Sequence, residues 1–289
     1  MSIPLGILEQ GSVFVGKTLQ ECINAVSSTG LLCCYDAGDI NCVSNATQAS
    51  WSDALGNEPD FYRGTSFAAD TGEPTFNGTP GGKSPNEYWT GPGPAAAANG
   101  VFQESGTLMD FAEPFHKDNA LFTMLALFYV PDAAPATDKF IFLFRSAFTT
   151  TGRGVAWYLS WDSANDIWEM LCVIYTGTSV ARSLRQTVPI VAGWNYAAVA
   201  VQENSNLARF NVNNTTIDSM AASYTSPSAS ASTSTYQIFG NVATIRAADM
   251  SDIPGFRAKA FAAFSAGKNA ATLSSYYAAI KADMLPSLP

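Results

Sequence analysis

Few residues of this chain have side chains suited to acid–base or metal chemistry. His116 is the one histidine among 289 residues. A zinc site with several histidine ligands is therefore impossible, and a Ser–His–Asp triad has only this histidine to use. His116 comes just before a strongly apolar stretch, which favours a surface or loop histidine over a catalytic one.

Paired carboxylates are the other common catalytic unit. A retaining glycosidase needs two carboxyl groups about 5–5.5 Å apart, a separation that one strand supplies at i, i+2 or i, i+4. The nearest approach to such a pair is Asp166 with Glu169, whose i, i+3 spacing places the two side chains on opposite faces of a strand. These residues therefore predict that the chain is not an enzyme.

Two loop motifs suggest ligand binding but have simpler interpretations. Residues 77–84, NGTPGGKS, resemble a phosphate-binding loop, but they begin with asparagine instead of glycine and contain a proline. Asp36, Asp39 and Asp53 offer oxygen ligands of the kind that Ca²⁺ takes. The alternative for these carboxylates is turn-forming hydrogen bonds to the backbone. We expect no nucleotide and no cofactor, with Ca²⁺ as the open alternative.

Sugar binding would use exposed aromatic rings next to hydrogen-bonding side chains. Residues 31–93 are irregular and contain repeated Gly, Pro, Asn and Asp turn formers, a composition typical of surface loops that carry function. Aromatic residues in these loops are the glycan-binding candidates, and packing or a subunit contact is the alternative. The candidates are Trp51, Tyr62, Tyr88 and Trp89.

The five cysteines show neither a disulfide framework nor a zinc ribbon. They are odd in number, and no CxxC pair occurs among them. We expect buried, small apolar side chains. A bond between Cys42 and either Cys33 or Cys34 stays open.

From residue 119 onward, strand patterns follow one another. Residues 121–130 are apolar at nearly every position, which predicts a central strand buried on both faces. The polar turn between 154–161 and 167–175 predicts a hairpin. The other expected strands are 139–144, 194–201, 207–212, 236–239 and 257–264.

One helix is expected at the end of the chain. Leucine, tyrosine, isoleucine and methionine recur at helical spacing from 273 to 284, and Thr272 can cap the start of this helix. Many strands with short turns and one terminal helix predict an all-β antiparallel sandwich. We expect residues 1–30 to form an extended N-terminal arm and residues 31–289 to form one sandwich domain.

Four segments occur in an order that resembles a known family. They are residues 32–39 (LCCYDAGD) with 51–57 (WSDALGN), residues 121–130, residues 193–201 (GWNYAAVAV) with 208–213 (ARFNVN), and residues 260–264 (AFAAF) with the terminal helix. Together they resemble the concanavalin A-like, laminin-G-like jelly roll of bacteriophage structural and tail proteins. Two features depart from that pattern: Asn214 stands where the family usually has glycine, and residues 58–100 are longer and richer in Gly and Pro.

A short apolar peptide lies at the N-terminus. It resembles the N-terminal peptide of many phage virion proteins, which implies that it docks on a neighbouring virion protein. The alternative is that it folds back on its own domain. The docking residues implied are Ile3, Pro4, Leu5, Ile7 and Leu8.

Charge and composition limit the partners. The net charge is −9 and the 15 Lys and Arg residues are scattered, so nucleic acid is excluded as a partner. No apolar stretch is long enough to span a bilayer, and no secretory signal is visible. Only 13% of residues are charged, and the surface is rich in Ser, Thr, Asn and Ala, which fits a homo-oligomer.

Taken together, these features predict a non-enzymatic structural protein of a phage particle. It would decorate the capsid or form part of a tail or fibre, docked by its N-terminal arm and located on the virion surface after synthesis in the host cytoplasm. The alternative is a carbohydrate-binding module that attaches to host-surface or environmental glycans.

Overall fold

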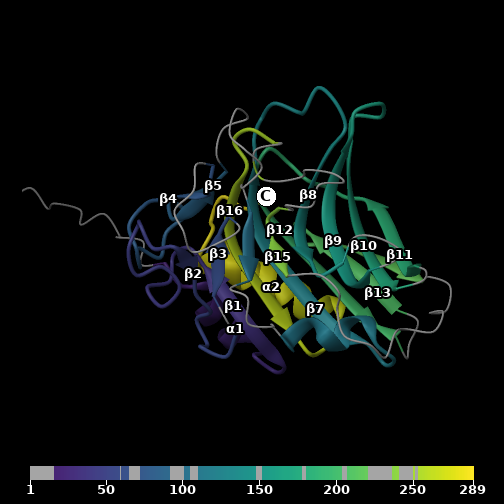
Figure 1. Cartoon of the computed structure of the whole chain (residues 1–289). Coiled ribbons are helices and arrows are strands. Elements are labelled where there is room, and N and C mark those ends of the chain that lie inside the picture. The colour runs from purple at the N-terminus through teal and green to yellow at the C-terminus, as the bar shows by residue number, and fades with distance from the viewer. Residues whose placement is uncertain are drawn as a thin grey trace, which may run out of the picture.

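The computed structural model describes residues 16–58, 60–64, 72–91, 101–104, 110–147, 152–177, 180–203, 207–220, 236–240, 250 and 253–289. The strands in these ranges form two sheets of eight strands each, and every pairing between them is antiparallel. The sheets pack against each other across one apolar core (Figure 1). The predicted antiparallel β-sandwich is therefore confirmed.

Sheet A carries the terminal helix. Its strands run in the order β14-β13-β12-β7-β16-β5-β4, and β1 also pairs with β16. Their bounds are β14 Thr215–Met220, β13 Leu207–Val212, β12 Gly193–Gln202, β7 Leu121–Val130, β16 Arg257–Phe264, β5 Tyr88–Thr90, β4 Thr75–Asn77 and β1 Leu31–Asp36.

Sheet B forms the other layer. Its strands run in the order β11-β10-β9-β8-β15-β6-β3-β2. The long strands lie at one end of this order and the short ones at the other, as Figure 1 shows. Their bounds are β11 Val180–Thr187, β10 Ile167–Thr176, β9 Arg153–Asp162, β8 Lys139–Arg145, β15 Gln237–Ile238, β6 Phe102–Glu104, β3 Phe61–Arg63 and β2 Ser50–Trp51.

The strand β7 explains why residues 121–130 are apolar at nearly every position. Alternate side chains of a strand point to opposite faces. Phe122 and Met124 point into the core between the sheets, whereas Leu125 and Leu127 point to the outer face of sheet A. Both faces of β7 are covered, which confirms the predicted central strand.

Two helices cover that outer face of sheet A. Helix α1 (Leu19–Val26) begins with a capping box between Thr18 and Glu21, and α2 (Ala270–Asp283) packs beside it. Side chains of both helices share one apolar cluster with the sheet. The cap of α2 is Asn269, whose side chain accepts the backbone N–H of Thr272, so the predicted cap at Thr272 is wrong by one turn.

The N-terminal arm is described only from residue 16 onward. Helix α1 falls inside the expected arm, yet its buried side chains Leu19, Cys22 and Ile23 belong to the same apolar cluster as α2. Residues 1–15, including the whole expected docking peptide, lie outside the described residues. The division at residue 30 therefore stays a prediction.

His116 is placed differently from the expectation. It ends the 3₁₀ helix η1 (Asp110–His116) and is fully buried. The surface position predicted for this histidine is wrong, because η1 packs against β9, β10 and β7 and carries the ring inward with Phe111 and Phe115.

All five cysteines are buried free thiols, and burial controls their reactivity. Burial raises the pKa of Cys22 to about 12 and raises the pKa of Cys33, Cys34 and Cys42 well above the usual thiol range. The Cys42 thiol donates to the carbonyl oxygen of Cys34 at 3.6 Å. Because the thiolate is the reactive form, these cysteines are chemically protected in the native state.

We therefore predict that an aromatic disulfide reagent at pH 8 labels essentially no cysteine in the native protein. After unfolding in guanidinium chloride it should label all five. The measurement is the absorbance of the released thiolate. Rapid labelling before unfolding would contradict the burial, and fewer than five thiols afterwards would reveal a disulfide.

Within the described ranges, no helix has both the length and the apolar character needed to cross a bilayer.

Candidate functional site

Two of the predicted glycan-binding residues are core residues. Trp51 and Trp89 have no exposed surface, and their ring centroids lie 6.0 Å apart inside the sandwich. The prediction that they stack on a sugar is therefore wrong. The short strands β2 and β5 bring these two rings inward from opposite sheets, whereas the Gly- and Pro-rich sequence around them is typical of surface loops.

The other two candidates are half-buried but lie far apart in the fold. Tyr62 belongs to β3 in sheet B, and Tyr88 belongs to β5 in sheet A. The side chain of Tyr88 packs against Trp194 and Arg257. The four predicted residues therefore do not form one site.

The three carboxylates proposed as Ca²⁺ ligands are bound to backbone N–H groups. Asp53 accepts the N–H of Cys34 at 2.7 Å and that of Asn57 at 3.0 Å. Asp39 accepts the N–H of Asn41 at 2.9 Å, as in an Asx turn. No group of three His, Cys, Asp or Glu side chains within the described ranges is arranged to hold a metal ion.

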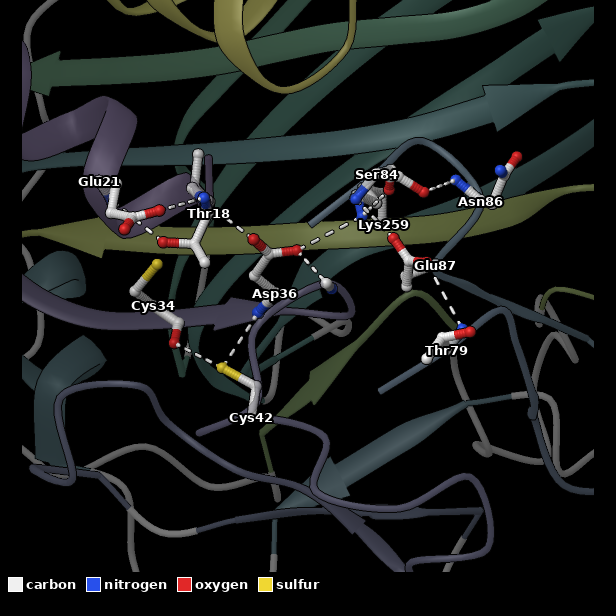
Figure 2. A network of polar contacts seen from close by, with 12 residues as sticks. Thr18, Glu21, Cys34, Asp36, Cys42, Thr79, Ser84, Asn86, Glu87 and Lys259 are labelled. Atoms are coloured by element: carbon white, nitrogen blue, oxygen red, sulfur yellow. Dashed lines mark hydrogen bonds and ion pairs between the residues drawn. The ribbon is translucent and has the colours of Figure 1, made fainter. Parts of the chain in front are cut away.

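Asp36 forms a buried ion pair with Lys259, shown in Figure 2. Both side chains are 1% exposed, and Nζ of Lys259 lies 3.7 Å from Oδ1 of Asp36. The carboxylate also accepts the N–H groups of Leu19 and Gly38, both at 2.8 Å. Burial raises the pKa of Asp36 and lowers the pKa of Lys259, while each charge opposes the shift of the other.

The same lysine fixes the segment that resembles a phosphate-binding loop. Nζ of Lys259 donates to the carbonyl oxygen of Ser84 at 2.8 Å. The Glu87 carboxylate accepts the N–H of Ser84, and Gly82 lies so close to this carboxylate that an added Cβ would collide with it. Gly82 therefore allows close packing against Glu87, which supports the loop interpretation of residues 77–84.

A pocket of about 500 Å³ opens on the outer face of sheet B, the face opposite the core. It lies over β8 to β11, the strands on the right of Figure 1. Its lining combines aromatic, charged and hydroxyl side chains. The lining residues are Asp138, Lys139, Phe140, Tyr158, Ser160, Trp161, Asp162, Leu171 and Arg185.

Aromatic rings form the apolar part of this pocket. Tyr158 of β9 and Phe140 of β8 are both half-buried, and their ring centroids lie 5.9 Å apart. Phe142, which is fully buried, supports Tyr158 from 5.3 Å. These contacts fix the orientation of the two lining rings before any ligand arrives.

Two carboxylates at the end of the β9–β10 hairpin form the polar part. Asp138 accepts two hydrogen bonds at Oδ1, from the backbone N–H and the hydroxyl of Ser163, at 2.9 and 2.7 Å. Asp162 accepts the side-chain amide of Asn165 at 2.8 Å. These hydrogen bonds lower the pKa of Asp138 and of Asp162, so both are ionised at neutral pH.

Arg185 of β11 reaches the pocket from the edge of the sheet. Its Nε donates to Oε2 of Glu169 at 2.8 Å, and its Nη2 contacts the same oxygen. This pair raises the pKa of Arg185. Because Glu169 balances its charge, Arg185 acts here as an oriented hydrogen-bond donor rather than as an unpaired positive charge.

The pocket offers ionised acceptors, hydroxyl and guanidinium donors, and aromatic rings within one hollow. The sequence analysis missed this pocket because it sought glycan-binding aromatic rings only in the loops of residues 31–93. The available signal was the alternation of Tyr158, Ser160 and Asp162 along β9, which marks one polar face. Trp157 and Leu159, which alternate with these residues along β9, point into the core.

Comparison with known proteins gives structural similarity only. No protein-family model matches the chain, and no curated protein matches it in sequence. The receptor-binding domain of botulinum neurotoxin type G matches with a TM-score of 0.53 and 11% identity, over 86% of this chain and 51% of that one. The binding domain of serotype D/C matches with a TM-score of 0.51 and 7% identity, over 87% and 52%.

A sialidase shows the same similarity. The sialidase of Trypanosoma rangeli, in complex with the inhibitor DANA, matches with a TM-score of 0.52 and 13% identity, over 92% of this chain and 35% of that one. The present chain thus spans about a third of the sialidase and about half of each toxin domain.

This similarity corrects one expectation. The sequence predicted that the chain is not an enzyme, but chains of an enzyme, the sialidase, contain this fold. At such low identity the match concerns the fold alone, so the earlier exclusion of enzymes does not hold. By its fold, the chain is an antiparallel β-sandwich similar to the toxin receptor-binding domains and to part of the sialidase chain.

Proposed function

We propose that the chain binds a hydroxyl-rich glycan in the pocket on the outer face of sheet B. The observation that carries this proposal is the meeting of aromatic rings and ionised carboxylates in one hollow of about 500 Å³. That volume lies in the range of roughly 300–1,000 Å³ that is usual for small-molecule sites.

Each part of the pocket has a role in this proposal. The C–H face of a sugar ring packs on Tyr158 and Phe140, which removes apolar surface from water. Oδ2 of Asp138 accepts a sugar hydroxyl, while Ser163 holds the carboxylate in place through Oδ1. Hydrogen bonds to a charged acceptor are stronger than those between neutral groups. Because Ser163 has already ordered the carboxylate, little entropy is lost on binding.

The similar structures are in keeping with a binding role. Two of them are described as the receptor-binding or binding domains of neurotoxins. Their shared fold supports the view that a sandwich of this kind can present a recognition surface. The glycan class proposed for this chain rests on its own pocket.

The test is a glycan array probed with the native protein and with Tyr158→Ala. We expect the native protein to bind at least one neutral oligosaccharide. Removal of the ring should weaken this binding by about tenfold or more, as for an aromatic anchor at the centre of a contact. Urea denaturation should show that the variant is still folded.

Tyr62→Ala is the matched control. Tyr62 is also half-buried and in sheet B, but it lies on β3, which is separated from the pocket strands by β6 and β15. It should leave glycan binding unchanged. An array with no bound glycan, or an equal loss in both variants, would reject the pocket as a glycan site.

The virion role stays a separate proposal from the sequence. It is supported by the resemblance to phage structural proteins and by the peptide at residues 3–8. Under this proposal, the arm docks on another virion protein and copies of the chain associate with one another. Glycan binding is compatible with it, since a particle surface could present the pocket to a host.

A further inference from the structure

A second aromatic cluster lies on the outer face of sheet A and surrounds an arginine. Arg257 begins β16, the strand between β7 and β5. Its guanidinium carbon lies 4.2 Å from the ring centroid of Tyr129 on β7 and 4.6 Å from that of Tyr88 on β5. Because the two tyrosines come from strands on opposite sides of β16, their rings hold the guanidinium between them.

Trp194 fixes both tyrosine rings. Its ring is edge-on to that of Tyr129 at 5.6 Å and to that of Tyr88 at 6.0 Å. Trp194 is only 7% exposed and belongs to the apolar cluster under α2. The position of the guanidinium of Arg257 on β16 therefore depends on packed side chains from three other strands, β5, β7 and β12.

Among the residues that the structure describes, no carboxylate pairs with Arg257. Arg185 pairs with Glu169, and Arg209 pairs with Asp218, but Arg257 makes only ring contacts within the described part of the chain. Arg257 is half-buried, and none of its nitrogens is among the buried polar atoms that lack a partner. Its N–H groups are therefore open to solvent.

The rings of Tyr88 and Tyr129 limit the directions from which a ligand can reach the guanidinium of Arg257. Arginine commonly stacks the flat faces of its guanidinium on aromatic rings, and in that arrangement its hydrogen-bond donors project from the edge of the group. Two parallel N–H donors at that edge match the two oxygens of a carboxylate. Ordering by the rings reduces the entropy that is lost when a ligand binds.

We propose that Arg257 binds the carboxylate of a small organic molecule, whose apolar body contacts the half-buried rings of Tyr88 and Tyr129. A carboxylate carries one negative charge, which one guanidinium neutralises. A phosphate would bring more charge to a protein whose net charge is −9. This site lies on the sheet opposite the glycan pocket and does not depend on that pocket.

The test is an NMR titration of the ¹⁵N-labelled native chain with sodium acetate and sodium benzoate at pH 7. Sodium chloride at matched ionic strength is the control. The Nε–H resonance of Arg257 and the indole N–H resonance of Trp194 are the reporters. We expect saturable shifts in the millimolar range, with benzoate binding more tightly than acetate because its ring contacts the aromatic side chains.

Two variants test the geometry. Arg257→Lys keeps the charge but loses the planar fork, so benzoate should bind about tenfold more weakly, as read from Trp194. Arg209→Lys, at an arginine that pairs with Asp218 and belongs to neither proposed site, should leave benzoate binding unchanged. Chloride shifts equal to those of benzoate, shifts that do not saturate, or unchanged affinity in Arg257→Lys would each overturn the proposal. The native titration alone decides it if the variant does not fold.

Discussion

Lys259→Met is expected to lower the free energy of unfolding by about 3–5 kcal/mol, because it leaves the Asp36 carboxylate buried without its cation. The two side chains are each 1% exposed, so water does not replace the missing charge. The backbone donors of Leu19 and Gly38 remain, but the link from Lys259 to Ser84 is lost. Urea denaturation followed by fluorescence measures the change.

The loss should depend on pH. Burial already raises the pKa of Asp36, and removal of Lys259 raises it further because the opposing positive charge is gone. A carboxyl group whose pKa is higher in the folded state than in the unfolded state costs stability as pH rises through the folded value. The free energy of unfolding of Lys259→Met should therefore lie further below that of the native protein at pH 8 than at pH 5.

Lys83→Met is the control for this prediction. Lys83 pairs with Glu21 at 2.9 Å, but the two side chains are 37% and 47% exposed, and such a surface pair contributes about 0–1 kcal/mol. If Lys259→Met and Lys83→Met lowered the free energy of unfolding by the same amount at every pH, the buried pair would contribute no more to stability than the exposed one.

Trp51→Ala is expected to cost about 3–5 kcal/mol of stability rather than to remove a sugar contact. The ring is fully buried, 4.9 Å from Phe102 and 6.0 Å from Trp89 between centroids. Its removal leaves a cavity where the short strands of the two sheets meet. The thermal midpoint and the urea midpoint should both fall.

Trp51→Phe gives the comparison, because it keeps an aromatic ring in the same place and should cost clearly less. If Trp51→Ala unfolded like the native protein but lost glycan binding, the original assignment of Trp51 to a sugar site would be restored. If both properties were unchanged, the described core position would be wrong.

The long strands were predictable because their signal is local. Residues 121–130 and 167–175 were expected as strands and are found as Leu121–Val130 and Ile167–Thr176. Runs of nine or ten residues that are mostly apolar and rich in β-branched and aromatic residues favour a buried strand. The terminal helix has the same kind of signal, although its cap at Asn269 lies earlier than expected.

The short and polar strands were missed for the opposite reason. β2, β3 and β4 contain two or three residues each, too few to show a period, and β14 (Thr215–Met220) is largely polar. These segments are strands because a neighbouring strand supplies hydrogen-bond partners. The sequence does not reveal such partners, because they lie far away along the chain.

The sequence by itself determined the layered all-β architecture. The pattern of apolar side chains along each long strand is a local property, and it shows whether one or both faces of that strand are buried. Only the tertiary structure decided which aromatic rings are core and which are surface. Trp51 and Tyr158 are both aromatic residues of strands, and nothing local distinguishes them. Trp51 faces the opposite sheet, whereas Tyr158 lines the pocket on the outer face of sheet B. The pairing of Asp138 with Ser163, of Asp36 with Lys259, and of Arg257 with two tyrosines joins residues distant in sequence. Such contacts depend on strand order, which no local pattern specifies.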